Sequence, residues 1–308
     1  MKFAAIFPGQ GSQKVGMGKD FFDNSDIAKE MIQEASARLK MDFEDLLFRQ
    51  NDKLELTQFA QPAILLVSSI AYKLFSLEIN KEPKFFLGHS LGEFSAVCAS
   101  GAMDYLDAID LVFSRGLLMS EACEDKNAGM MALLGLDDET VESLVKIAQK
   151  EGKKIWTANY NCDGQIVLAG DKSDLKEMES IFKNSGAKRA IVLNMSVASH
   201  CPILANAQAK LATCLDMFID DTFNAPIISN VTAKPYDTKS EAVRLLSDQL
   251  VKPVLYKQSI KSIEDEVDKF FEFGGTVLKG INRKITKKET LSIVDMDSLE
   301  KAILDFNK

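Results

Sequence analysis

The sequence of 308 residues has few cysteines, and the five that it has are scattered. They are odd in number and form no Cys-x-x-Cys pair: Cys98, Cys123, Cys162, Cys201 and Cys214. This spacing indicates neither a disulfide framework nor a zinc site. We therefore expect no bound metal and a reducing, cytoplasmic location.

Long apolar runs without charge are also lacking. A membrane-spanning helix needs about 20 predominantly apolar residues, whereas the longest candidate, around Ala63–Phe75, is shorter and contains Lys73. The apolar start Met1–Phe7 leads directly into Pro8–Gln13, without the length or the cleavage site of a signal peptide. We expect no membrane segment, and a buried first strand at Phe3–Phe7.

Positive charge is scarce, because 37 lysines and arginines stand against 45 acidic residues and the formal net charge is −8. Nucleic-acid phosphates attract proteins with a positive surface field, so we expect no nucleic-acid partner. One segment departs from this balance, since half of the residues from 279 to 288 are cations: Lys279, Arg283, Lys284, Lys287 and Lys288. Such a run is usually a solvated face.

The pattern of expected elements changes once along the chain. Between residues 128 and 195, apolar spacing and turn signals predict strand 130–136, helix 139–150, strand 154–160, strand 165–169, helix 173–184 and strand 189–194. This βαββαβ order is typical of a ferredoxin-like α+β fold. We therefore predict a small inserted domain of residues 128–195.

Outside this segment, short apolar strands alternate with longer helical stretches. The strands are predicted at 3–7, 84–87, 227–230, 269–273 and 291–294. Such alternation gives a mainly parallel sheet covered by helices. We predict a discontinuous large α/β domain of residues 1–127 and 196–308, although the order of its strands does not follow from the pattern.

A reactive serine is indicated by Gly-x-Ser-x-Gly at residues 88–92, between the strand 84–87 and the apolar helical stretch Phe94–Ala99. The two glycines let the backbone turn sharply and lift Ser90 out of the sheet, as in the nucleophile elbow of an α/β-hydrolase-like core. The start of the following helix favours negative charge on an attacked carbonyl oxygen. We predict that Ser90 is a nucleophile.

A serine nucleophile needs a base, and histidine suits neutral pH. The chain contains only two histidines. His89 precedes Ser90 directly, so in an extended strand its side chain points to the other side. By elimination we predict that His200 is the base and that His89 has a structural hydrogen bond.

Arg115 lies in the apolar stretch Ile109–Met119, where a buried cation needs an anionic partner. Its planar guanidinium matches a carboxylate in two parallel hydrogen bonds. The partner is either a carboxylate on the substrate or an internal one, from Asp107, Asp110 or Glu121, and the sequence leaves both readings open.

Several motifs together resemble malonyl-CoA:acyl carrier protein transacylases over essentially the whole chain. They occur in the order seen in that family: Phe7–Gln13, Ala60–Ala63, Gly88–Glu93, Ser114–Gly116, Asn159–Asn161, Ser196–His200 and Gln249–Val254. The resemblance implies an acyltransferase that supplies malonyl groups to fatty acid synthesis.

The resemblance also implies roles for individual residues. Ser90 would carry the malonyl group, and His200 would act as general base and later as acid. The backbone N–H groups of Gln10 and Leu91 would form the oxyanion hole, and Arg115 would bind the malonyl carboxylate. Further residues would support the site: Gln249, whose main chain orients the histidine, and Asn159 and Asn161, which line the cleft.

The implied reaction is ping-pong transfer, in which coenzyme A leaves and the phosphopantetheine thiol of an acyl carrier protein takes the malonyl group. It needs no metal or prosthetic group, since the donor is already an activated thioester. Carrier proteins are usually acidic, so Lys279–Lys288 is the expected docking face. Two alternatives are a serine hydrolase or thioesterase on a related scaffold, against which Arg115 argues, and a binding protein without catalysis.

Overall fold

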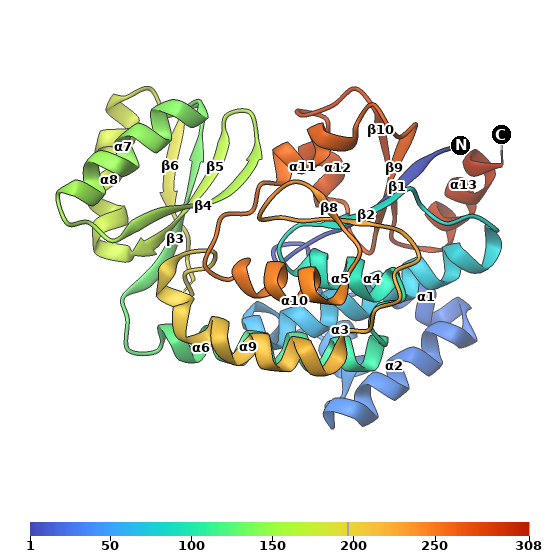
Figure 1. Ribbon diagram of the computed structural model, residues 1–308. Helices are drawn as coiled ribbons and strands as arrows, with labels where there is room; N and C mark the ends of the chain where they lie inside the picture. The colour runs from blue at the N-terminus through green and yellow to red at the C-terminus, as the bar shows by residue number, and fades with distance from the viewer. Residues whose placement is uncertain (196, 308) are drawn as a thin grey trace.

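The computed structural model describes residues 1–195 and 197–307, and its chain folds around two β-sheets (Figure 1). The larger sheet has the strand order β10-β9-β1-β2-β7-β8. Its strands are β1 (Phe3–Phe7), β2 (Phe85–Gly88), β7 (Ile227–Ile228), β8 (Pro235–Tyr236), β9 (Lys269–Phe273) and β10 (Glu289–Ile293). All neighbours pair in parallel except β7 and β8. The prediction of a mainly parallel sheet is therefore confirmed.

Helices cover both faces of this sheet. They are α1 (Lys19–Asn24), α2 (Asp26–Leu39), α3 (Phe43–Phe48), α4 (Thr57–Glu78), α5 (Leu91–Ala99), α6 (Tyr105–Cys123), α9 (Ala205–Phe218), α10 (Lys239–Asp248), α11 (Tyr256–Ile263), α12 (Val277–Asn282) and α13 (Met296–Phe306), with short 3-10 turns η1 (Lys53–Glu55) and η2 (Pro202–Leu204). Alternate residues of a strand face opposite sides. Accordingly, Phe7 of β1 packs with the cluster of α4, α5 and α6, whereas Ile6 packs with α11 and α12.

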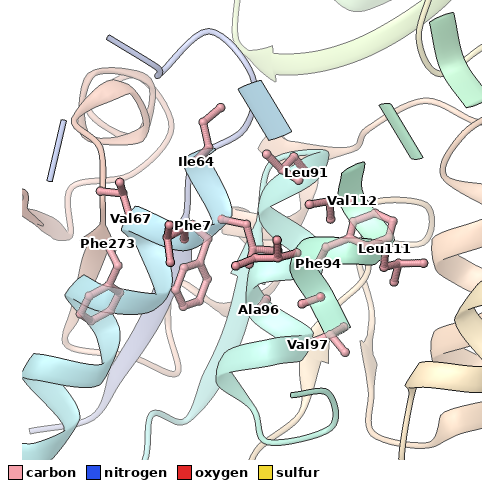
Figure 2. Packing of buried hydrophobic residues seen from close by; sticks show 14 of the residues in the cluster. Phe7, Ile64, Val67, Leu91, Phe94, Ala96, Val97, Leu111, Val112 and Phe273 are labelled. Carbon is pink, nitrogen blue, oxygen red and sulfur yellow. The ribbon is translucent and has the colours of Figure 1, made fainter. Parts of the chain in front are cut away.

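The main core lies between β1, β9 and the helices α4, α5 and α6. Figure 2 shows Phe7 and Phe273 beside Val67 of α4, with Phe94 of α5 next to Val112 of α6. Each of these side chains is almost completely buried, which stabilises the fold by about 1.5–3 kcal/mol per large side chain. This packing fixes α5, which begins directly after Ser90, and α6, which carries Arg115.

The smaller sheet has the order β4-β5-β3-β6, and all its strands pair antiparallel. Its strands are β3 (Ala128–Leu134), β4 (Ile155–Cys162), β5 (Gln165–Asp171) and β6 (Arg189–Val192), and its helices are α7 (Asp138–Lys150) and α8 (Lys172–Asn184). The side chains of Asp137 and Asp171 cap the two helices, because each accepts a hydrogen bond from the first turn. The predicted order of elements between 128 and 195 is thus present.

Two predictions about the strands of the larger sheet need correction. The strand expected at 227–230 ends at Ile228, because the chain turns at Ser229 and returns as β8, a short strand that the pattern did not indicate. The strand expected at 291–294 begins at Glu289. Helix α4 extends well beyond the apolar run around Ala63–Phe75. Of the described residues, only those of α4 form a helix with the length and composition of a membrane span, and 72% of its most apolar window is buried inside the fold.

Candidate active site

Ser90 lies at the turn between β2 and α5, with φ 54° and ψ −108°. This conformation is strained for a residue with a side chain and costs on the order of 1–3 kcal/mol. Both flanking glycines are required by close approach of the backbone. A Cβ on Gly88 would lie 1.9 Å from the carbonyl carbon of Gly92, and one on Gly92 would lie 2.0 Å from the carbonyl oxygen of Phe7. The predicted sharp turn is present.

The hydroxyl of Ser90 is hydrogen-bonded to His200, with 2.8 Å between Oγ and Nε2. The other ring nitrogen, Nδ1, lies 2.6 Å from the backbone oxygen of Gln249. A carbonyl oxygen only accepts, so Nδ1 carries the proton and Nε2 is free to accept one from Ser90. Burial lowers the pKa of His200 to about 3, and the charge of Arg115 contributes to this shift as the second cause. The ring is therefore neutral at pH 7.

His89 points away from the serine hydroxyl, as predicted. Its Nε2 lies 2.7 Å from Oδ1 of Asn161, and its ring lies against Tyr256. Asn161 therefore holds His89 in place, while Asn159 lines the pocket without a role that its contacts define.

Arg115 is 2% exposed and reaches the serine. Its Nη2 donates to Ser90 Oγ at 3.3 Å and to Gln249 Oε1 at 3.1 Å, and its Nη1 donates to Gln61 Oε1 at 2.7 Å. Its Nε has no acceptor among the described residues. Burial lowers the pKa of Arg115 to about 10, which leaves it charged at pH 7.

No carboxylate lies within 4.0 Å of this guanidinium among the described residues. Asp107 and Asp110 both pair with Arg38, and the carboxylate of Glu121 is 4.0 Å from Lys210. The reading of Arg115 as the partner of one of these three acids is therefore wrong. A buried cation without an anionic partner is costly, so the arrangement favours an anionic ligand beside Ser90.

The backbone N–H groups of Gln10 and Leu91 have no hydrogen-bond acceptor among the described residues, and both residues line the pocket that contains Ser90. Leu91 is the first residue of α5, where free N–H groups and the helix dipole favour negative charge. The loop that carries Gln10 is held by a hydrogen bond of 2.7 Å from Thr57 Oγ1 to Gln10 Oε1. The two donors are thus available to an oxyanion.

The pocket has a volume of about 480 Å³ and lies between the two sheets. The larger sheet and its helices contribute Ser90 and Arg115, and the smaller sheet contributes Met130, Asn159 and Val167. No group of three or more His, Cys, Asp or Glu side chains that could hold a metal ion is found in the described part of the chain. Ser196, the first residue of the motif that ends at His200, lies outside the described residues.

Comparison with known proteins identifies the family. The family described as Acyl transferase domain matches residues 5–278. The chain is 37% identical over 306 residues to the malonyl CoA-acyl carrier protein transacylase of Bacillus subtilis, covering 98% of this chain and 96% of that protein. The chain belongs to the malonyl-CoA:acyl carrier protein transacylase family. It is therefore an acyltransferase, as the motifs predicted.

Solved structures of this family agree. The malonyl-CoA:acyl carrier protein transacylase of Helicobacter pylori superimposes with a TM-score of 0.97 at 46% identity, over 100% of this chain and 99% of that one. PlMCAT, solved in complex with AntF, a type II polyketide synthase acyl carrier protein, gives a TM-score of 0.95 at 33% identity, over 99% and 100% of the two chains. The α/β fold class of the transacylase family is thus confirmed for this chain.

Three residues of this transacylase-family site were not predicted from the sequence. Gln61 accepts from Arg115, Asn230 accepts from the backbone N–H of Ser90 at 2.7 Å, and Glu93 binds both Asn230 and Gln249. Gln61 and Glu93 lie inside the motifs Ala60–Ala63 and Gly88–Glu93, and Asn230 is the last residue of the strand predicted at 227–230. Their contacts could not be predicted, because these join residues up to 156 positions apart in the chain.

Proposed function

We propose that this acyltransferase moves the malonyl group from malonyl-CoA to the phosphopantetheine thiol of an acyl carrier protein, through an ester on Ser90, and so supplies malonyl groups for fatty acid synthesis. The observation that carries the proposal is the position of Arg115. Its guanidinium is buried, lacks an ion-pair partner among the described residues and lies 3.3 Å from the serine oxygen that His200 activates.

In the first half-reaction, Ser90 Oγ attacks the thioester carbonyl while its proton passes to His200 Nε2. The oxygen of the tetrahedral intermediate would receive hydrogen bonds from the N–H groups of Gln10 and Leu91. The C–S bond then breaks, and the imidazolium returns its proton to the leaving coenzyme A sulfur. The Gln249 carbonyl keeps the proton on Nδ1 throughout.

In the second half-reaction, the phosphopantetheine thiol gives its proton to His200 as the sulfur attacks the malonyl-Ser90 ester. The ester C–O bond breaks, and His200 returns the proton to Ser90. Because both acyl donors are activated, a proton shuttle and an oxyanion site are sufficient, and the proposal includes no metal or prosthetic group.

Arg115 would bind the malonyl carboxylate and select the substrate. Of its donors, Nε has no acceptor among the described residues and Nη2 already faces Ser90. A guanidinium edge aimed at the nucleophile would place the malonyl carboxylate in the pocket with its thioester carbonyl near Ser90. An acyl group without a carboxylate would leave the buried cation unpaired. The alternative of a serine hydrolase gives Arg115 no such task.

The carrier protein would dock near the segment Lys279–Lys288. In the described structure Arg283, Lys284 and Lys287 are exposed, which suits electrostatic attraction to an acidic partner. The variant Lys284→Glu/Lys287→Glu should raise the KM for the carrier protein several-fold and leave malonyl-enzyme formation unchanged. An unchanged KM at low salt would place the docking face elsewhere.

The strand order of the smaller sheet supports our proposal that residues 128–195 form a ferredoxin-like small domain. The elbow at Ser90 supports an α/β-hydrolase-like core built from residues 1–127 and 196–308. The cytoplasmic location stays a prediction, based on the five scattered cysteines.

Intact-protein mass spectrometry after brief mixing with malonyl-CoA tests this function. Wild type should gain one malonyl group, and Ser90→Ala should gain none. Arg115→Ala should lose the malonyl adduct and accept an acetyl group from acetyl-CoA instead. Rapid release of free malonate by wild type, without an adduct, would favour the hydrolase and contradict the transferase.

A further inference from the structure

A buried carboxylate lies directly beneath the nucleophile. Glu93 follows Ser90 by three residues in α5 and is fully buried. Its carboxylate accepts hydrogen bonds from Gln249 Nε2 at 2.7 Å, from the backbone N–H of Asn230 at 3.1 Å and from the hydroxyl of Tyr236 at 3.1 Å. No Lys, Arg or His nitrogen of the described residues lies within 4.0 Å of it. Three neutral donors thus hold a carboxylate that has no contacting counter-ion.

Two of these three donors belong to residues that hold the peptide groups of Ser90. Oδ1 of Asn230 accepts from the Ser90 N–H at 2.7 Å, and Nε2 of Gln249 donates to the Ser90 carbonyl at 3.0 Å. A strained residue persists only where its surroundings over-determine its conformation. Glu93 connects the two groups that do so here, and its own N–H bonds to the same Ser90 carbonyl.

The carboxylate, together with the Ser90 carbonyl, sets which way the Gln249 amide points. An ionised carboxylate only accepts, so it must receive the NH2 side of the amide. The amide oxygen then faces Nη2 of Arg115, at 3.1 Å. In the reverse orientation two acceptors would meet at Glu93 and two donors would meet at Arg115. The main chain of Gln249 meanwhile holds His200, so this one residue joins the base, the nucleophile and the guanidinium.

We propose that Glu93 is a positioning residue of malonyl transfer, which fixes the Gln249 amide and Asn230 and thereby aims Arg115 and holds the strained Ser90. The inference rests on the proposed function, because it takes Arg115 as the site of the malonyl carboxylate. Glu93 has a second effect at longer range, since its ionised carboxylate attracts the Arg115 guanidinium without contacting it.

The chain contains a matched control that distinguishes this positioning role from a merely structural one. Glu272 of β9 is also fully buried and also has three hydrogen-bond donors: the N–H groups of Leu278 and Lys279 and the hydroxyl of Ser292. It makes no hydrogen bond with Ser90, Arg115, His200 or Gln249. Glu272→Gln therefore removes a buried charge of the same kind without disturbing the contacts of the site.

The test compares Glu93→Gln and Glu272→Gln by rates of acyl-enzyme formation from malonyl-CoA and acetyl-CoA, with the folded fraction measured by circular dichroism. A glutamine at 93 can offer either oxygen or NH2, so position 93 no longer selects the orientation of the Gln249 amide, which is then held by Ser90 and Arg115. Glu93→Gln should lower kcat/KM for malonyl-CoA by about 10- to 100-fold, by analogy with the outer-shell residues that orient the ligands of a metal ion. It should lower the malonyl-over-acetyl ratio, whereas Glu272→Gln should change neither by more than about twofold.

Equal ratios in the two variants, at equal folded fraction, would overturn the proposal. The wild-type malonyl adduct on Ser90 reports separately on the proposed function, so failure of one is distinguished from failure of the other.

If Glu93→Gln does not fold, Tyr236→Phe keeps the proposal testable. This change removes one hydrogen bond to the carboxylate and touches neither Ser90 nor Gln249. The hydrogen bond favours the ionised carboxylate, so its loss should raise the pKa of Glu93 above about 7. The other titratable groups that act on Glu93 are Arg115 of α6 and Tyr236 itself, and neither changes charge between pH 6 and 8.5. Protonation of Glu93 should lower the malonyl-over-acetyl ratio, so the pH below which this ratio falls should be higher in Tyr236→Phe than in wild type. An identical dependence of the ratio on pH in variant and wild type would contradict the inference.

Discussion

Replacing Arg115 by methionine removes the charge of the guanidinium and keeps most of the apolar stem. Arg115 is 2% exposed, so a malonyl carboxylate bound there would lose its partner inside the protein. Breaking a buried ion pair by removing one partner costs about 3–5 kcal/mol. At about 1.4 kcal/mol for each factor of ten, kcat/KM for malonyl-CoA should fall by roughly 100-fold or more. Acetyl-CoA has no carboxylate to lose, and its kcat/KM should stay constant or rise.

The assay measures kcat/KM for both thioesters with the same carrier protein as acceptor. Arg38→Met is the control, because Arg38 is a partly exposed cation that pairs with Asp107 and Asp110 away from the pocket. It should leave the malonyl-over-acetyl ratio unchanged. If Arg115→Met reduces both substrates by the same factor, the carboxylate is not bound at Arg115, and the assignment of this residue is refuted.

Other predictions concern stability and the elbow. Glu93 has a pKa raised by burial to about 7 in the fold against an ordinary value near 4.5, so its contribution to stability is present below pH 4.5 and is lost as the pH rises through 7. His200, with its pKa lowered to about 3, has the opposite sign, and its contribution is present above pH 6.5 and lost as the pH falls. Urea denaturation measures the free energy of unfolding of Glu93→Gln and His200→Gln relative to wild type. Between pH 4.5 and 6.5 these two differences should change with pH in opposite directions, by at most about 1.4 kcal/mol per pH unit. Differences that change in the same direction would refute the assignment. Gly92→Ala should destabilise the fold by at least about 1–3 kcal/mol, since its Cβ would lie 2.0 Å from the carbonyl oxygen of Phe7. Gly280 has open space around it, so the urea midpoint of Gly280→Ala should be near that of wild type. Equal midpoints for the two glycine variants would show that the elbow relaxes.

The parts of the fold that depend on local pattern were predictable from the sequence. Apolar runs bounded by turn residues located β1 and β9, and the change of pattern after residue 127 located the smaller sheet. The pairing of Ser90 with His200 was also predictable, because only two histidines were available and one was excluded by its neighbour. Each of these inferences uses spacing within a short segment, or the scarcity of a residue type.

The remaining features depend on contacts between distant segments. The order of the strands, the short strand β8 and the turn at Ser229 follow from how the chain returns across the sheet, and no local period records that. The partner of Arg115 could not be chosen from the sequence, since Asp107 and Asp110 are close in the chain but face Arg38 in space. The network of Glu93, Asn230 and Gln249 was missed for the same reason, because its hydrogen bonds link α5 to residues that follow β7 and α10.

The central claim is that Ser90 carries the malonyl group between two thiols. The most direct test isolates the malonyl-enzyme free of coenzyme A and mixes it with phosphopantetheinylated acyl carrier protein, while intact-mass spectra follow both proteins. The account predicts that the malonyl mass leaves the enzyme and appears on the carrier protein at a rate that rises with carrier concentration. Release of free malonate at a rate independent of the carrier protein would contradict it.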